Sequence, residues 1–109
     1  MKVLSLFDGI SCGMLALQRA GIPVECYDAF EIDKYAVTVS KRNFPVIVHH
    51  GNVYDGDFTQ FKGYDLLLGG SPCTYWSIAK KDREVDCNGE GFRLFKEYVR
   101  ALEESGCKY

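Results

Sequence analysis

The sequence predicts an α/β protein in which a parallel sheet of about four strands is flanked by helices. Short β-type runs alternate with stretches of helical periodicity along the chain, which is the order that a parallel α/β sheet requires. Glycine and Asp-Gly turn signals separate several of these segments. With 47% hydrophobic and 26% charged residues among 109, the composition is sufficient for one packed core. Residues 1–109 are therefore expected to form part of one domain.

The first half of the chain contains two strand–helix units. Strands are expected over residues 2–7 and 24–32, and helices over residues 11–20 and 33–43. The first strand ends at the turn signal Asp8-Gly9, and Gly21 is a typical helix stop. Asp33 is a suitable N-cap for the second helix, which Pro45 would end.

The second half is predicted to complete the sheet and to cover one of its faces. Strands are expected over residues 46–48 and 64–68. A helix is expected over residues 92–104, where apolar side chains recur on one face: Leu94, Phe95, Tyr98, Val99 and Leu102. Ligands of parallel α/β sheets bind beyond the carboxyl ends of the strands. The loops that follow the strands are therefore the candidate functional segments.

The loop after the first strand has the sequence FDGISCG over residues 7–13. Its glycines allow a ligand to approach the backbone, and the helix that follows offers free N–H groups at its start. Gly9 and Gly13 are four residues apart with no third glycine, so the dinucleotide pattern G-x-G-x-x-G is not matched. No Gly-Lys-Ser/Thr follows, so the loop is not a phosphate loop either.

Three further loops carry polar or reactive side chains. FEID places Glu31 roughly 20 residues past the glycine loop, where an acid can accept hydrogen bonds from ribose hydroxyls. Ile32 is then suited to lie against an adenine ring. In GNVYD, Asn52 can hydrogen-bond the edge of a purine while Val53 packs on it. GGSPC presents the Cys73 thiol on a rigid loop, beside the cofactor pocket that the other loops are expected to form. The thiolate is the reactive form of a cysteine.

Composition and charge argue against a metal-binding, disulfide-stabilised, secreted or membrane protein. A net charge of −2 argues mildly against tight DNA binding by these residues alone. The five cysteines include no Cys-x-x-Cys pair, so neither a metal site nor a disulfide framework is predicted. No apolar run is long enough for a membrane span or a signal peptide. We therefore expect a cytoplasmic protein with reduced thiols and no membrane partner.

The four loops, in this order, resemble the opening motifs of the DNA cytosine-5 methyltransferases. The resemblance covers essentially the whole chain, and the FDG and GGSPC loops are its most specific parts. GGSPC together with Gly91-Phe92-Arg93-Leu94-Phe95 is similar to the branch that includes the mammalian de novo enzymes, a form that prokaryotic and phage members share. The resemblance implies a Rossmann-like, S-adenosylmethionine-dependent methyltransferase fold. Residues 1–109 would be the N-terminal portion of its catalytic domain, in a prokaryotic or phage-encoded enzyme.

The resemblance also implies roles for individual residues. Cys73 would be the nucleophile that attacks carbon 6 of a cytosine flipped out of double-stranded DNA. S-adenosyl-L-methionine would be held by Phe7, Asp8, Gly9, Ile10, Ser11, Gly13, Glu31, Ile32, Asn52, Val53, Pro72 and Leu94. Contacts to DNA would come from Ser77, Lys80, Lys81 and Arg83, in a polar segment just after the cysteine.

The sequence departs from the family pattern at several positions. Asn52 replaces the more usual acid, although its amide oxygen can still accept a hydrogen bond, and Ser71 replaces a common proline. Thr74-Tyr75-Trp76 is bulkier than the usual segment after the cysteine. The Glu-Asn-Val strand, the arginine motif, the target-recognition region and the final helix of the family are absent from these residues. The chain is therefore expected to need the C-terminal half of the enzyme as a partner, and an open sheet edge predicts self-association.

Three alternatives remain at this point. The chain is a non-catalytic remnant that binds nucleotide or a partner protein, or it belongs to a tRNA cytosine-5 methyltransferase of the same family. A nicotinamide-dependent dehydrogenase is a more distant alternative, which the glycine spacing disfavours.

Overall fold

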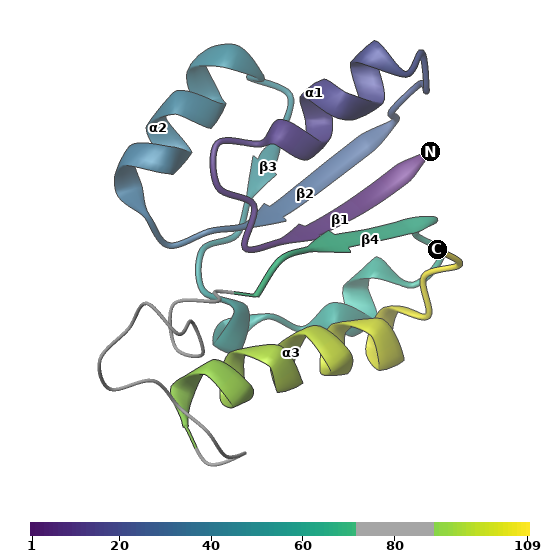
Figure 1. Ribbon diagram of the computed structural model, residues 1–109. Helices are drawn as coiled ribbons and strands as arrows, with labels where there is room; N and C mark the ends of the chain where they lie inside the picture. The colour runs from purple at the N-terminus through teal and green to yellow at the C-terminus, as the bar shows by residue number, and fades with distance from the viewer. Residues whose placement is uncertain (72–88) are drawn as a thin grey trace.

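The computed structural model describes residues 1–71 and 89–109. They contain a four-stranded parallel sheet in the order β3-β2-β1-β4 (Figure 1). The strands are β1 (Lys2–Leu6), β2 (Cys26–Phe30), β3 (Val48–His49) and β4 (Leu66–Gly69). The order reverses at β1, which pairs with β2 on one side and β4 on the other. The predicted parallel sheet is confirmed.

Helices cover both faces of the sheet. α1 (Cys12–Arg19) and α2 (Lys34–Asn43) lie on one face, and α3 (Glu90–Ser105) lies on the other (Figure 1). Two short 3-10 helices, η1 (Val53–Asp55) and η2 (Phe58–Phe61), contact α3. Within residues 1–71 and 89–109, no helix combines the length and apolar character that a membrane span would need.

Among the described residues, two apolar clusters form the core, one on each face of the sheet. Alternation along β1 sends Val3 to one face and Leu4 and Leu6 to the other. The cluster beneath α1 and α2 contains Val3, Met14, Leu17, Tyr27, Ala29 and Ile47. The cluster beneath α3 contains Leu4, Leu6, Phe30, Val53, Phe58, Phe61, Leu67, Ala101 and Cys107. This second cluster supports the loops that follow β2 and β3.

Local signals explain most of the element boundaries. The Asp33 carboxylate accepts hydrogen bonds from the N–H groups of Tyr35 (2.9 Å) and Ala36 (3.3 Å), which caps α2 as predicted. The third strand is shorter and later than the predicted 46–48, because only Val48 and His49 pair with β2. The fourth strand begins two residues later than the predicted 64–68 and extends to Gly69.

The apolar face of α3 differs from the prediction. Leu94 and Tyr98 pack on the sheet, whereas Phe95, Val99 and Leu102 are exposed. Three small residues, Gly91, Ala101 and Ser105, are the fully buried positions of the helix. α3 packs mainly on η2 and η1, and its buried face is rotated away from the stripe of large apolar side chains.

The C-terminal residues pair with β4. The Tyr109 N–H donates to the Asp65 carbonyl and the Leu67 N–H donates to the Tyr109 carbonyl, both at 2.9 Å. The β4 edge is thus hydrogen-bonded within this chain at that point, and the self-association predicted from an open sheet edge stays a prediction.

Replacing Gly69 by alanine should lower the free energy of unfolding by about 1–3 kcal/mol. An added Cβ would lie 2.5 Å and 2.8 Å from two atoms of the Tyr98 ring and 3.1 Å from the Leu6 carbonyl oxygen. Gly70→Ala is the matched control, because its Cβ would meet nothing within 4 Å. Urea unfolding of both variants checks this; equal midpoints would contradict the close packing of Tyr98 on β4.

Candidate functional site

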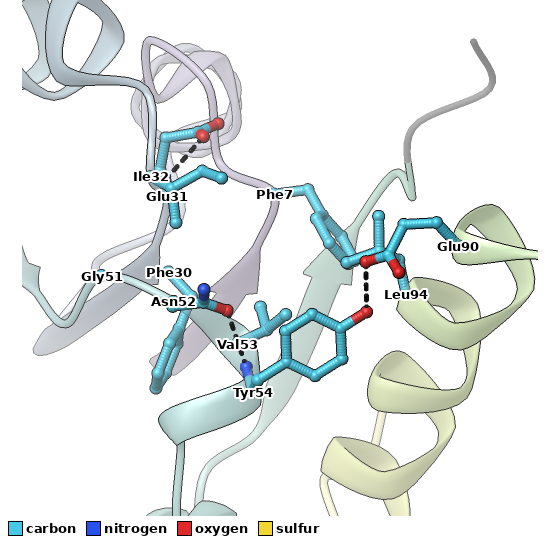
Figure 2. Close-up of a pocket in the computed structure, with 10 residues that line it drawn as sticks. All are labelled: Phe7, Phe30, Glu31, Ile32, Gly51, Asn52, Val53, Tyr54, Glu90 and Leu94. Atoms are coloured by element: carbon cyan, nitrogen blue, oxygen red, sulfur yellow. Dashed lines mark hydrogen bonds between the residues drawn. The ribbon is translucent and has the colours of Figure 1, made fainter. Parts of the chain in front are cut away.

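A cavity of about 300 Å³ lies at the carboxyl ends of the strands. Its lining comes from the end of β1, from the loops after β2 and β3, and from the first two turns of α3 (Figure 2). The lining residues are Phe7, Phe30, Glu31, Ile32, Gly51, Asn52, Val53, Tyr54, Glu90 and Leu94. The volume is at the lower end of the range of small-molecule sites. The position is the one expected for a ligand site beside the point where strand order reverses.

The cavity brings together half of the residues predicted to bind cofactor. Phe7, Glu31, Ile32, Asn52, Val53 and Leu94 line it. Asp8, Gly9, Ile10, Ser11 and Gly13 are described by the structure but are not among its lining residues. The FDG loop therefore borders the cavity through Phe7. Its Gly9 N–H supports the lining residue Glu31 by a hydrogen bond.

The Glu31 carboxylate joins two of the predicted loops. It accepts hydrogen bonds from the N–H groups of Gly9 (2.8 Å), Ile32 (2.8 Å) and Asp33 (3.1 Å). The bond to Gly9 crosses from the loop after β2 to the loop after β1. A carboxylate offers about four acceptor positions, so a ligand with two hydroxyl donors must share this group with the backbone.

Asp8 is turned away from the cavity into a polar network beneath α1 and α2. Its carboxylate accepts from the hydroxyls of Ser5 (2.6 Å), Ser11 and Tyr27 (2.7 Å). Ser11 is fully buried and shares a 2.5 Å hydrogen bond with Ser40 of α2. Burial, with a further contribution from the Asp8 carboxylate, raises the pKa of Tyr27 and keeps its phenol protonated. Asp8 and Ser11 thus fix the loop rather than face the cavity.

The other residues of the first loop also have structural surroundings. Gly9 has a φ of 63°, which favours glycine. A Cβ on Gly13 would lie 2.9 Å from both the Leu68 side chain and the Tyr27 hydroxyl, so α1 packs on the sheet through this glycine. Ile10 is 50% exposed and lies beside a separate hollow that includes Cys12.

Asn52 caps η1 instead of presenting its oxygen to the cavity. The Asn52 side-chain carbonyl accepts from the Tyr54 N–H at 2.9 Å. Its amide NH2 group therefore faces the cavity (Figure 2), and no hydrogen bond is recorded for it within the described part of the chain. Asn52 was expected to present a hydrogen-bond acceptor, its carbonyl oxygen, to the cavity, and it presents a donor, its NH2 group, instead.

A hydrogen bond spans the cavity between η1 and α3. The Tyr54 hydroxyl donates to the Glu90 carboxylate at 2.6 Å (Figure 2). Burial, together with this bond to the Glu90 carboxylate, raises the pKa of Tyr54 to about 12. The phenol is consequently a stable donor at neutral pH, and it holds the carboxylate at its hydroxyl end.

Apolar surface lines the cavity between these polar groups. Ile32 is 69% exposed although it is a large aliphatic residue, whereas Val53 is buried. Phe7 and Leu94 pack against the core cluster that contains Val53. An exposed isoleucine beside a cavity with buried apolar walls is suited to contact a flat ring.

Sequence reasoning missed four of the lining residues: Phe30, Gly51, Tyr54 and Glu90. The first three lie within or beside motifs that were singled out, so loop position alone could have indicated them. No sequence motif around Glu90 indicated a binding role, because its place in the cavity depends on how α3 packs. Pro72, Cys73, Ser77, Lys80, Lys81 and Arg83 fall outside the described residues, and their predicted roles remain predictions.

Residues 1–109 match a family model described as C-5 cytosine-specific DNA methylase. The chain is 37% identical over 113 residues to the orphan methyltransferase M.SPRI of Bacillus phage SPR, covering 100% of this chain and 25% of the phage protein. It is 33% identical over 116 residues to the DNA (cytosine-5)-methyltransferase DRM2 of Arabidopsis thaliana, covering 94% of this chain and 18% of DRM2. The chain therefore spans a quarter or less of the length of these relatives.

Solved structures share the fold. The Schizosaccharomyces pombe Dnmt2 methyltransferase superposes with a TM-score of 0.65 at 18% identity, over 94% of this chain and 29% of that one. A Spodoptera frugiperda DNMT2 variant gives 0.63 at 20% identity, over 95% and 41%. These likenesses confirm the Rossmann-like methyltransferase fold predicted from the sequence.

Proposed function

Since this chain belongs to the C-5 cytosine-specific DNA methylase family, we propose that it is the cofactor-binding and nucleophile-bearing portion of a DNA cytosine-5 methyltransferase. The complete enzyme transfers a methyl group from S-adenosylmethionine to carbon 5 of cytosine. The observation that carries the proposal is the cavity at the carboxyl ends of the strands, where Glu31 links two loops beside an exposed Ile32. DNA methyltransferases named among the relatives include phage and plant proteins.

The lining of the cavity fits the nucleoside end of S-adenosylmethionine. Ile32 and Val53 provide apolar surface for the adenine ring, and the Glu31 carboxylate is the acceptor for ribose hydroxyls. Phe7 and Leu94 border the same space. Hydrogen bonds of Ser5 and Ser11 to the Asp8 carboxylate fix the backbone of the FDG loop. This loop begins at Phe7, which lines the cavity.

The proposed chemistry uses the Cys73 thiolate as the nucleophile. Its sulfur bonds to carbon 6 of the cytosine, and the electron pair of the carbon 5–carbon 6 double bond makes carbon 5 nucleophilic. Bound S-adenosylmethionine would supply the methyl group to carbon 5, its methyl–sulfur bond breaking to leave S-adenosylhomocysteine. A base then removes the carbon 5 proton, the double bond forms again and the cysteine leaves as thiolate.

Access to carbon 6 requires the cytosine to leave the duplex. We propose that the base is flipped into the enzyme, and that Ser77, Lys80, Lys81 and Arg83 contact the phosphates around it. The glutamate that holds the cytosine ring and the target-recognition region would come from the C-terminal half of the enzyme. Methylation of phage or bacterial DNA would take place in the cytoplasm.

Calorimetric titration of S-adenosylmethionine and S-adenosylhomocysteine into the 109-residue chain tests the proposal. We expect both to bind at one site, and NAD to give no heat, because the glycine spacing does not suit a dinucleotide. Circular dichroism on the same sample establishes that the chain is folded. Absence of binding by a folded chain would overturn the proposal that these residues form the cofactor pocket.

A further inference from the structure

We propose that Glu90, held in place by Tyr54, accepts a hydrogen bond from the 6-amino group of the cofactor's adenine and makes the cavity selective for a 6-amino purine. The inference rests on the proposed function, since it concerns the nucleoside end of the same ligand. It assigns a specificity-determining role to a residue on α3, outside the four loops.

Asn52 turns its amide NH2 group, rather than its carbonyl oxygen, toward the cavity. Its carbonyl oxygen is engaged by the Tyr54 N–H at 2.9 Å, which leaves its NH2 group toward the cavity. An amide NH2 group donates hydrogen bonds and cannot accept one from an amino group. Asn52 is therefore matched to a ring nitrogen, and the amino group of adenine needs an acceptor elsewhere.

Glu90 is a lining residue with the required chemistry. It lines the cavity from the α3 side, and Phe7 and Leu94 line the same cavity (Figure 2). Glu31, the other carboxylate in the lining, already accepts three backbone N–H groups. The Glu90 side chain is 40% exposed; one of its oxygens receives the Tyr54 hydroxyl, and the other lies 3.8 Å from the Arg93 guanidinium. Acceptor positions remain for a ligand.

The position of the Glu90 side chain is fixed by its surroundings. Glu90 lies in the first turn of α3, where a negative charge interacts favourably with the helix dipole. The 2.6 Å bond from Tyr54 ties it to η1, the element whose Val53 forms another wall of the cavity. Tyr54 is thus a positioning residue, because it orients the carboxylate without itself being the acceptor.

The test compares two ligands in matched variants. The ligands are S-adenosylhomocysteine and its analogue with hydrogen in place of the 6-amino group, so that they differ by a single donor. We expect the wild-type chain to bind the adenine form about tenfold more tightly, the value of one modest hydrogen bond to a charged group. Calorimetry gives both dissociation constants, and their ratio is the readout.

In Glu90→Met the ratio should fall to about one, because the acceptor is lost while side-chain length is kept. Tyr54→Phe should lower the ratio partially, because the carboxylate loses its anchor. Glu103→Met makes the same chemical change at an exposed position of α3 outside the cavity and should keep the wild-type ratio. A general loss of stability weakens both ligands alike and leaves the ratio unchanged, so the ratio separates recognition from folding.

Each alternative result is decisive. Equal binding of the two ligands by the wild-type chain, or a wild-type ratio in Glu90→Met, overturns the role of Glu90 while the proposed function stands. Absence of binding of either ligand to the folded wild-type chain overturns the proposal that these residues form the cofactor pocket, and this inference with it.

Discussion

Replacing Glu31 by alanine is expected to weaken binding of S-adenosylhomocysteine by about a hundredfold or more. The substitution removes the proposed acceptor for the ribose hydroxyls. It also removes the acceptor for the Gly9, Ile32 and Asp33 N–H groups, so the loops after β1 and β2 lose their direct link. Hydrogen bonds to a charged group contribute about 1.5–3 kcal/mol each, which is why the combined effect should be large.

Calorimetry measures the affinity of the Glu31 variant, and urea unfolding measures its stability. Glu25→Ala is the matched control, because Glu25 precedes β2 at the opposite end of the strand and its carboxylate is exposed. We expect wild-type affinity in the control. Near-normal affinity in Glu31→Ala would show that the ligand does not use this carboxylate.

The second large effect is expected for Arg100→Ala, which should lower the free energy of unfolding by about 3 kcal/mol. The guanidinium donates to the carbonyls of Gly56 (2.8 Å) and Val53 (3.0 Å), and it lies 4.5 Å from the centre of the Phe58 ring. Glu97 and Glu104 accept its remaining hydrogen bonds. Arg100 therefore attaches α3 to the segment that carries η1 and one wall of the cavity.

Arg100→Lys should recover only a minor part of this stability. An ammonium is a compact charge and cannot reach two carbonyls and two carboxylates at once as the planar guanidinium does. Lys96→Ala, on an exposed position of the same helix, controls for loss of a positive charge. If Arg100→Ala unfolds at the wild-type urea concentration, the guanidinium does not hold α3 to η1.

Elements whose signals are local were predicted well. The Asp33 cap and Pro45 bracket α2, and the observed helix ends within two residues of the proline. The 3-10 helices were missed although Asn52 and Asp57 cap them through the Tyr54 and Thr59 N–H groups. Both caps are Asx turns, a pattern that the sequence shows directly.

Features that depend on distant residues could not be predicted. Asp8 accepts a hydrogen bond from the Tyr27 hydroxyl of β2, and Ser11 shares one with Ser40 of α2. These contacts join positions 19 and 29 residues apart. The cofactor contact predicted for Asp8 stays a prediction. Glu90 enters the cavity because α3 packs against η1 and η2, where Tyr54 binds it. Tertiary packing, rather than any motif, decides these roles.

The register of β1 has a consequence for the order in which the molecule assembles. Lys2 pairs with Cys26, whereas Val3 pairs with Leu66 on its other side. Closing the chain between Val3 and Leu66 costs about 1 kcal/mol more in chain entropy than closing it between Lys2 and Cys26. The β1-α1-β2 unit should therefore form before β4 and α3 join it.

The cavity takes Glu31 from this early unit and Leu94 from the late one, α3. We therefore expect S-adenosylhomocysteine to slow unfolding in stopped-flow experiments more than it speeds folding, since its site needs the late unit as well as the early one.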